Sequence, residues 1–182
     1  MKVAGAKGSV QHTDHFASEE ENMGARAEQL AKKFDETCRE MHSTVEKLSD
    51  ADWKKTTSAE KWTVGVVAHH VAQSHAGIAG LVDMVAKGKP LPHMTMDMIH
   101  EGNAKHAKEH ANTTKTETLA LSKENSAKAA GMVRGLSDEE LERSAPLLGG
   151  PPMTSAQVIE VILINHVNEH LGSIKATTGA GG

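Results

Sequence analysis

Apolar residues recur every three or four positions along residues 27–48, with charged residues between them. The series comprises Ala27, Leu30, Ala31, Phe34, Cys38, Met41, Val45 and Leu48. An α-helix turns by about 100° per residue, so this spacing places all of these side chains on one helix face. We predict a first amphipathic helix that ends at the segment LSDADW, where Ser49 and Asp50 supply turn and cap chemistry.

Two further helices are predicted in the middle of the chain. The segment KWTVGVVAHHVAQSHAGIAGLVDMVAKG contains a second helix, with Thr63 as its cap and Gly88 and Pro90 at its end. After the proline-containing loop GKPLPHMT, a long polar helix is predicted over residues 96–134. Its weak apolar face carries mainly alanine, asparagine and threonine.

The C-terminal part predicts a fourth helix. The segment LGGPPMT is typical of a rigid turn, after which Thr154 or Ser155 caps a helix that runs to about Lys175. No stretch alternates between apolar and polar residues as strands joined by hairpin turns do. The predicted fold is therefore all-α, a four-helix bundle with at least one long crossover connection.

The length of 182 residues is that of one domain. We assign residues 21–176 to a single helical bundle domain, residues 1–20 to a flexible N-terminal segment and residues 177–182 to a flexible tail. A chain of this length buries roughly two thirds of its unfolded surface, so its core needs neither a disulfide nor a structural metal. A bound metal would therefore serve function.

Composition narrows the classes of partner. The formal net charge is -4, and two Trp, two Phe and no Tyr leave few rings on which bases could stack, so we expect no nucleic-acid partner. The single cysteine, Cys38, lies on the apolar face of the first helix, where we expect an inert thiol. No segment has the length and apolarity of a secretory signal or a membrane span, so we expect a cytoplasmic protein with a small-molecule substrate.

The 12 histidines are the unusual feature of the composition. The otherwise apolar segment VILINHVNEHLGSI carries His166 and His170, four residues apart, on a helix predicted to be buried on nearly every side. In the second helix, His70 lies about 40° from the middle of the apolar stripe, whereas His69 and His75 lie on the order of 100° or more away. We expect His70 to face the core and the other two to face away from it.

These three inward histidines predict a metal site. A pair at i and i+4 places both imidazoles within reach of one ion, and His70 from a facing helix would complete a three-nitrogen site with open coordination positions. Such an ion activates a water or polarises a substrate oxygen or sulfur. Val167 follows His166 where a zinc protease would have glutamate, so this is not a protease motif. The alternative is that His166 and His170 are core histidines hydrogen-bonded to backbone or water.

Other polar residues are candidates for the pocket. His106 and His110 in NAKHAKEHANTT have the same spacing but stand among charged residues, which is typical of a solvated face. His110 is the better candidate to face inward, where it could line the pocket without binding metal. Gln73, Asn103 and Asn165 are the nearest polar candidates to orient ligands or substrate, although each could equally form an interhelical hydrogen bond. The role of the His106 and His110 pair stays open.

Together, KWTVGVVAHHVAQSH and the later INHVNEHLGSI resemble motifs of the DinB-like (DNA-damage-inducible) family, which shares a four-helix bundle with mycothiol-dependent maleylpyruvate isomerases. The resemblance covers about residues 30–175. In that family a Trp followed by Ser or Thr opens the second helix, and a histidine eight positions after the Trp is the first metal ligand, which falls on His70. The family's last-helix pattern of two histidines four apart, with the second followed by x-G-x-I, falls on His166 and His170.

The resemblance implies a divalent ion, commonly zinc or nickel, and often a homodimer. Relatives include transferases and isomerases that use a low-molecular-weight thiol, and hydrolases predicted to depend on metal. The leading hypothesis is thus a metal-dependent thiol transferase, isomerase or hydrolase in which a water or thiol at the ion reacts. The alternative is a non-catalytic metal-binding or stress-response module of the same fold.

Overall fold

The computed structural model describes residues 24–180, so the N-terminal segment predicted at residues 1–20 lies outside the described residues. In chain order the elements are α2 (Ala25–Lys47), α3 (Asp50–Trp53), α4 (Val64–Ala86), α5 (Met96–Glu109), α6 (Lys115–Arg134), α7 (Asp138–Glu142), β1 (Ser144–Pro146), β2 (Pro152–Thr154), α8 (Ser155–Gln157), the π-helix η1 (Val158–Ile164) and α9 (Asn165–Thr178). No helix within residues 24–180 combines the length and apolar character that a bilayer crossing requires.

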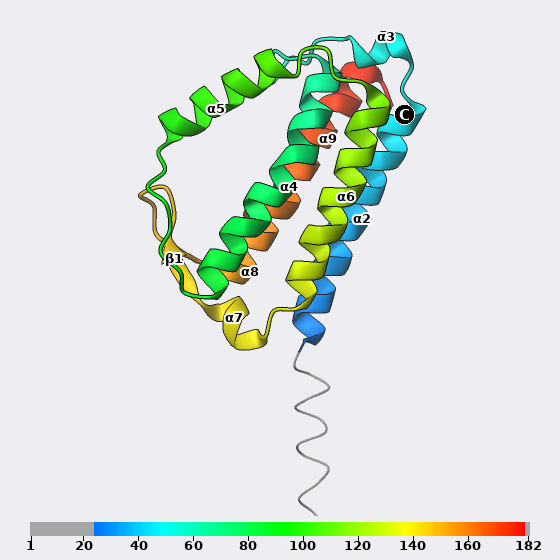
Figure 1. Ribbon diagram of the computed structural model, residues 1–182. Coiled ribbons are helices and arrows are strands. Elements are labelled where there is room, and N and C mark those ends of the chain that lie inside the picture. Colours follow the sequence, from blue (N-terminus) through cyan, green and yellow to red (C-terminus); the bar gives the residue numbers. More distant parts are fainter. Residues whose placement is uncertain (1–23, 181–182) are drawn as a thin grey trace, which may run out of the picture.

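Four long helical elements form the bundle (Figure 1). Helix α2 and the continuous segment α8–η1–α9 run in one direction, whereas α4 and α6 run in the other. Because α4 and α6 are neighbours with the same direction, the chain must return along the bundle between them, and this return contains α5. The predicted all-α four-helix bundle with a long crossover connection is confirmed.

The single helix predicted over residues 96–134 is wrong, because the structure has two helices there, α5 and α6. The side chain of Thr114 accepts a hydrogen bond from the backbone N–H of Glu117 and caps α6. Asparagine and threonine compete with helical backbone bonds through their own side chains, which favours a break at Asn112 to Thr114. As a result α6 joins the bundle (Figure 1), while α5 belongs to the crossover and contacts α4.

The expectation of no strands is also wrong in one place. Strands β1 and β2 pair antiparallel, with Ser144 opposite Thr154. Each strand has three residues, which is too short to give an alternating pattern in the sequence. Leu148 and Gly149 turn the chain with φ of 54° and 73°. This hairpin brings Leu147 and Leu148 to the cavity described below.

The last helix departs from its prediction on one side. Most of its apolar residues are buried as expected, namely Val158, Ile159, Leu163, Ile164, Val167, Leu171 and Ile174. Val161 is instead 54% exposed. It lies in η1, and a π-helix has wider turns than an α-helix, so the side chains do not follow the regular α-helical spacing. This irregular segment ends directly before α9, which carries His166 and His170.

Candidate metal centre

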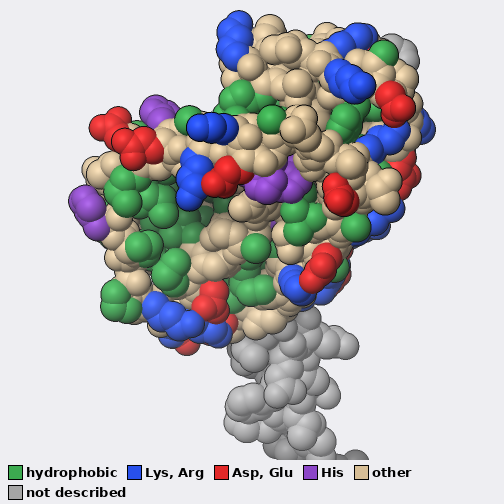
Figure 2. Space-filling view, turned by 45° about the horizontal axis from the view of Figure 1, so that its top comes forward, with side chains coloured by type: hydrophobic (Ala, Val, Ile, Leu, Met, Phe, Trp, Pro, Cys, Tyr) green, Lys and Arg blue, Asp and Glu red, His purple; other side chains and the backbone are tan. Residues whose placement is uncertain are grey.

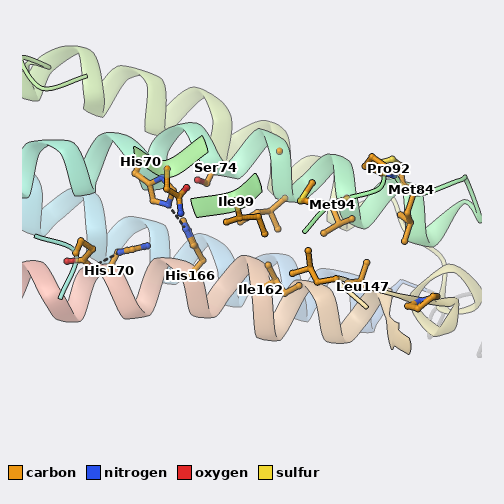
Figure 3. Close-up of a pocket in the computed structure, with 18 of the residues that line it drawn as sticks. His70, Ser74, Met84, Pro92, Met94, Ile99, Leu147, Ile162, His166 and His170 are labelled. Carbon is orange, nitrogen blue, oxygen red and sulfur yellow. Dashed lines mark hydrogen bonds and ion pairs between the residues drawn. The ribbon is translucent and has the colours of Figure 1, made fainter. Parts of the chain in front are cut away.

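Three histidines from two helices meet inside the bundle (Figure 3). His70 comes from α4, and His166 and His170 come from successive turns of α9. Each offers one ring nitrogen, and these three atoms all lie within 4.8 Å of one another. We refer to these residues as the first histidine triad. The structure thus brings together the three histidines that the sequence selected.

The spacing of the donor atoms suits one divalent ion. The Nε2 atoms of His70 and His166 are 3.0 Å apart. Two imidazole nitrogens bound to the same tetrahedral zinc ion would lie about 3.3 Å apart, given zinc–nitrogen bonds of about 2.0 Å. Imidazole ligands suit zinc, nickel, copper and iron, so the donor set defines a class of ion rather than one metal.

The protonation states also suit metal binding. Burial, together with the nearby His170 ring, lowers the pKa of His70 to about 4 and that of His166 to about 3. Both rings are therefore neutral at neutral pH, and neutral imidazole is the form that binds metal.

Glu60 holds one of the three rings. It lies in the loop between α3 and α4, where its Oε1 is 2.8 Å from Nδ1 of His170 and its Oε2 accepts a hydrogen bond of 2.7 Å from the hydroxyl of Ser173. A carboxylate accepts hydrogen bonds, so Nδ1 of His170 is the donor, which leaves its Nε2 as the nitrogen that can face an ion. Burial acts to raise the pKa of Glu60, but hydrogen bonds from Ser173, Thr57 and His170 outweigh it and lower the pKa overall.

Sequence reasoning missed Glu60, although a signal was present. It is the one carboxylate in the segment KKTTSAEKWT, directly before the Trp62 motif. Carboxylates that hydrogen-bond a metal-ligating histidine are a common feature of such sites, and a search for one near the motif would have selected Glu60.

Replacing Glu60 with glutamine is expected to weaken zinc binding by about 10- to 100-fold. Loss of a residue that hydrogen-bonds a metal-ligating histidine has an effect of this size in other metal sites. Glutamine keeps the shape of the side chain but removes the charge that fixes the His170 ring. A competitive titration against a chelating dye measures the effect. Glu169→Gln is the matched control, because Glu169 is an exposed residue of α9. Equal affinity in Glu60→Gln and the parent would show that Glu60 has no part in the site.

A cavity of about 620 Å³ opens beside the triad. Apolar side chains from α4, the crossover, the hairpin and η1 line most of it, among them Ile78, Met94, Leu147 and Ile162 (Figure 3). Its polar lining consists of the triad with Glu60, Ser74 and Asn103. A pocket with few polar groups at one end and an apolar body is typical of a small-molecule site.

Hydrophobic side chains also reach the surface around this region. The large exposed ones include Met94, Met96, Met98 and Leu148, which belong to the crossover and the hairpin. Figure 2 shows hydrophobic side chains gathered on the left of the molecule, the side on which Figure 1 places α5 and β1. Apolar side chains of the crossover and the hairpin therefore lie at the surface as well as in the cavity.

Comparison with known families finds one family that matches most of the chain. The family described as the mycothiol maleylpyruvate isomerase N-terminal domain matches residues 34–171. The chain belongs to this family. The match begins in α2 and extends past His170 in α9, so the matched family domain contains the whole first triad. The DinB-like resemblance inferred from the two histidine motifs is thereby confirmed.

Two solved structures share the fold of this domain. One is a histidine-to-alanine mutant of mycothiol-dependent maleylpyruvate isomerase, with a TM-score of 0.67 and 12% identity over 81% of this chain and 60% of that chain. The other is YfiT from Bacillus subtilis, a probable metal-dependent hydrolase with an unusual four-helix bundle topology, with a TM-score of 0.64 and 17% identity over 97% of this chain and 94% of that chain. The domain thus spans only 60% of the isomerase. No curated protein matches the sequence.

The other residues selected from the sequence lie in different places. Asn103 lines the cavity, as expected. Gln73 and Asn165 are exposed and do not line it. His110 does not line the cavity either, because it belongs to another histidine cluster.

This second histidine triad consists of His69, His106 and His110, whose donor nitrogens lie within 4.8 Å of one another. The expectations that His69 faces away from the core and that His106 lies on a solvated face are wrong, because both are buried. Contacts between α5 and α4 bury these rings. The angles of side chains around α4 describe that helix alone, so they cannot show that α5, from the crossover, packs against it.

The expectation for His75 is wrong as well, since its side chain is 1% exposed and its ring stands edge-on to Phe34 at 5.3 Å. Helix α4 packs against α6 on one side and against η1 and α9 on another. It therefore buries a wider face than the single apolar stripe on which the prediction depended.

Proposed function

We propose that this domain is a divalent-metal-dependent enzyme that acts on a small, largely apolar molecule. His70, His166 and His170 would hold the ion, with zinc or nickel as the proposed metals. The proposal depends on one observation above all, the position of three clustered histidines at the polar end of an apolar cavity of about 620 Å³. When bound by three imidazoles, such an ion lowers the pKa of a coordinated water and polarises a substrate oxygen or sulfur.

The residues of the chain would orient the reaction. Glu60 fixes the ring of His170 through its hydrogen bond to Nδ1. Trp62 stands edge-on to His70 with ring centroids 5.5 Å apart, which limits rotation of that ring. Ser74 and Asn103 offer hydrogen-bonding groups to a polar part of the substrate, while the apolar lining would contact its apolar part.

Hydrolysis is the reaction that the cavity supports best. Among the described residues, neither lysine nor arginine lines the cavity, so no cation is placed to bind the carboxylates that glutathione and bacillithiol carry. The four arginines instead pair with carboxylates outside the cavity: Arg26, Arg39, Arg134 and Arg143. Thiol-dependent transfer or isomerisation is the second candidate, and membership of the isomerase domain family favours it.

The test is a panel of reactions with untagged protein loaded with zinc or nickel. One arm contains small esters and amides, and the other contains glutathione, bacillithiol or mycothiol with acceptors for transfer or isomerisation. We expect metal-dependent hydrolysis, whereas activity confined to the thiol arm would support the second candidate. Activity that survives replacement of His70, His166 and His170 by alanine would contradict both.

Without turnover, bound metal would indicate the third candidate, a non-catalytic module whose assembly responds to the ion. Sedimentation with and without chelator tests this, since such a module should change its oligomeric state. The same measurement tests the homodimer, which we propose as the assembly. The cytoplasmic location stays a prediction.

Cys38 does not supply a reactive thiol in this proposal. Its side chain is 3% exposed, and burial, with a smaller contribution from the charge of Asp35, raises its pKa to about 12. Because this pKa lies far above 8, almost no thiolate forms at about pH 8. A thiol-reactive dye at that pH should therefore label Cys38 only after the protein unfolds. Labelling of the native protein at the rate of a small free thiol would show that the thiol is accessible.

A further inference from the structure

The second histidine triad joins two elements that otherwise have little contact. His69 lies on α4, whereas His106 lies on α5 and His110 at the residue that ends it. Nδ1 of His69 is 3.5 Å from Nε2 of His106. The ring of His110 stacks on His69 at 4.0 Å between centroids and lies 4.6 Å from His106.

The three donor nitrogens converge from two helices, within 4.8 Å of one another. Three imidazoles arranged in this way are a donor set that suits zinc, nickel and copper.

Helix α5 provides a second, independent observation. Within α5, all of which the structure describes, His106 is the single buried residue. Met96 and Met98 are 50% and 51% exposed, so the helix buries almost no apolar side chain. A helix of this length normally needs an apolar face packed against its neighbours to stay formed in water. The fully buried part of the contact between α5 and α4 is therefore a histidine cluster, where an apolar contact would be expected.

We propose that His69, His106 and His110 bind a second divalent cation, which ties the crossover helix α5 to α4. The consecutive residues His69 and His70 would then serve different ions. The two triads are adjacent, since the rings of His70 and His106 lie 5.3 Å apart. Because α5 also contributes Ile99 and Asn103 to the cavity, the second ion fixes one wall of the proposed substrate site. This second site does not depend on the function proposed above.

The experiment counts zinc ions per chain by elemental mass spectrometry after chelation, reloading and dialysis of the untagged full chain. We expect about two zinc ions in the parent and about one after His106→Ala with His110→Ala. We also expect about one after His166→Ala with His170→Ala, because each pair of substitutions removes one triad.

The matched control is His93→Ala with His100→Ala, which removes two exposed histidines from the same crossover and should leave about two zinc ions bound. His110→Ala alone guards against a misfolded double variant, because His110 is half-buried at the end of a helix. Hydrogen exchange provides a further readout that needs no substitution within the second triad. In the variant lacking His166 and His170, zinc should slow exchange of Met96–Glu109.

The outcomes separate the two metal sites. One zinc ion in the parent that is lost with His166 and His170, and no slowing of exchange in α5, would overturn the second site and leave the first intact. One ion that persists without His166 and His170, but is lost in His110→Ala, would support the second site and contradict the proposed function.

Discussion

Replacing His70 with alanine is expected to weaken zinc binding at the first triad by more than about 100-fold. The loss of a residue that only hydrogen-bonds a metal ligand weakens binding by up to about 100-fold, and His70 is proposed as a ligand itself. His70 is the one ligand of that triad supplied by α4, and its Nε2 lies 3.0 Å from that of His166. Without it, only the two histidines of α9 face the ion, and the coordination falls from three nitrogens to two.

A competitive titration against a chelating dye measures this loss, in protein that also lacks His106 and His110 so that the second triad does not contribute. His93→Ala is the control, because His93 is exposed and lies in neither triad. Circular dichroism should show an unchanged helical fold, since alanine favours the helix. Unchanged zinc affinity in His70→Ala would remove His70 from the site.

Replacing Phe34 with alanine is expected to lower the free energy of unfolding by about 3–5 kcal/mol, because it removes a large ring from a packed core. Phe34 is 0% exposed on α2, and its ring meets His75 of α4 at an interplanar angle of 87°. The edge-to-face contact adds to the burial of the ring itself. Domains of this kind have a total stability of about 5–15 kcal/mol, so the variant would lose a large part of it.

Urea denaturation followed by circular dichroism measures this change. Phe34→Leu is the matched control and should cost less than about 2 kcal/mol, because leucine fills most of the same space. A loss below about 1 kcal/mol in Phe34→Ala would mean that the core around Phe34 can relax to fill the space of the missing ring.

The elements predicted best are those whose pattern is set within one helix. The first helix was expected over residues 27–48 and is found at Ala25–Lys47, because its apolar residues repeat without interruption. Thr63 caps α4 as predicted, through its hydrogen bond with the N–H of Val66. The choice of His70 likewise needed only its angle to the apolar stripe of its own helix.

The features that sequence analysis missed depend on contacts between residues that are far apart in the sequence. His69 and His106 are buried because α5 lies against α4, and nothing in either segment alone specifies that contact. The angle of His69 to the apolar stripe of its helix and the charged neighbours of His106 favoured exposure. Glu60 was missed for a similar reason, since its partner His170 lies in the last helix.

Short-range features were missed for another reason. The break at Thr114 divides two helices that are both polar, so no change of hydrophobic pattern marks it. The strands β1 and β2 are too short to alternate visibly. Both errors concern the connections between the bundle helices, and these connections supply α5 and the hairpin that line the cavity.

The most direct test of the central claim is the metal content of untagged protein, measured by elemental mass spectrometry beside a variant with His166→Ala and His170→Ala. The account predicts that the first triad holds near-stoichiometric divalent metal in the parent. The variant should lose that equivalent while circular dichroism shows the same helical fold. Equal metal content in parent and variant, or none in the parent after incubation with zinc and nickel, would contradict the claim that His70, His166 and His170 form a metal site.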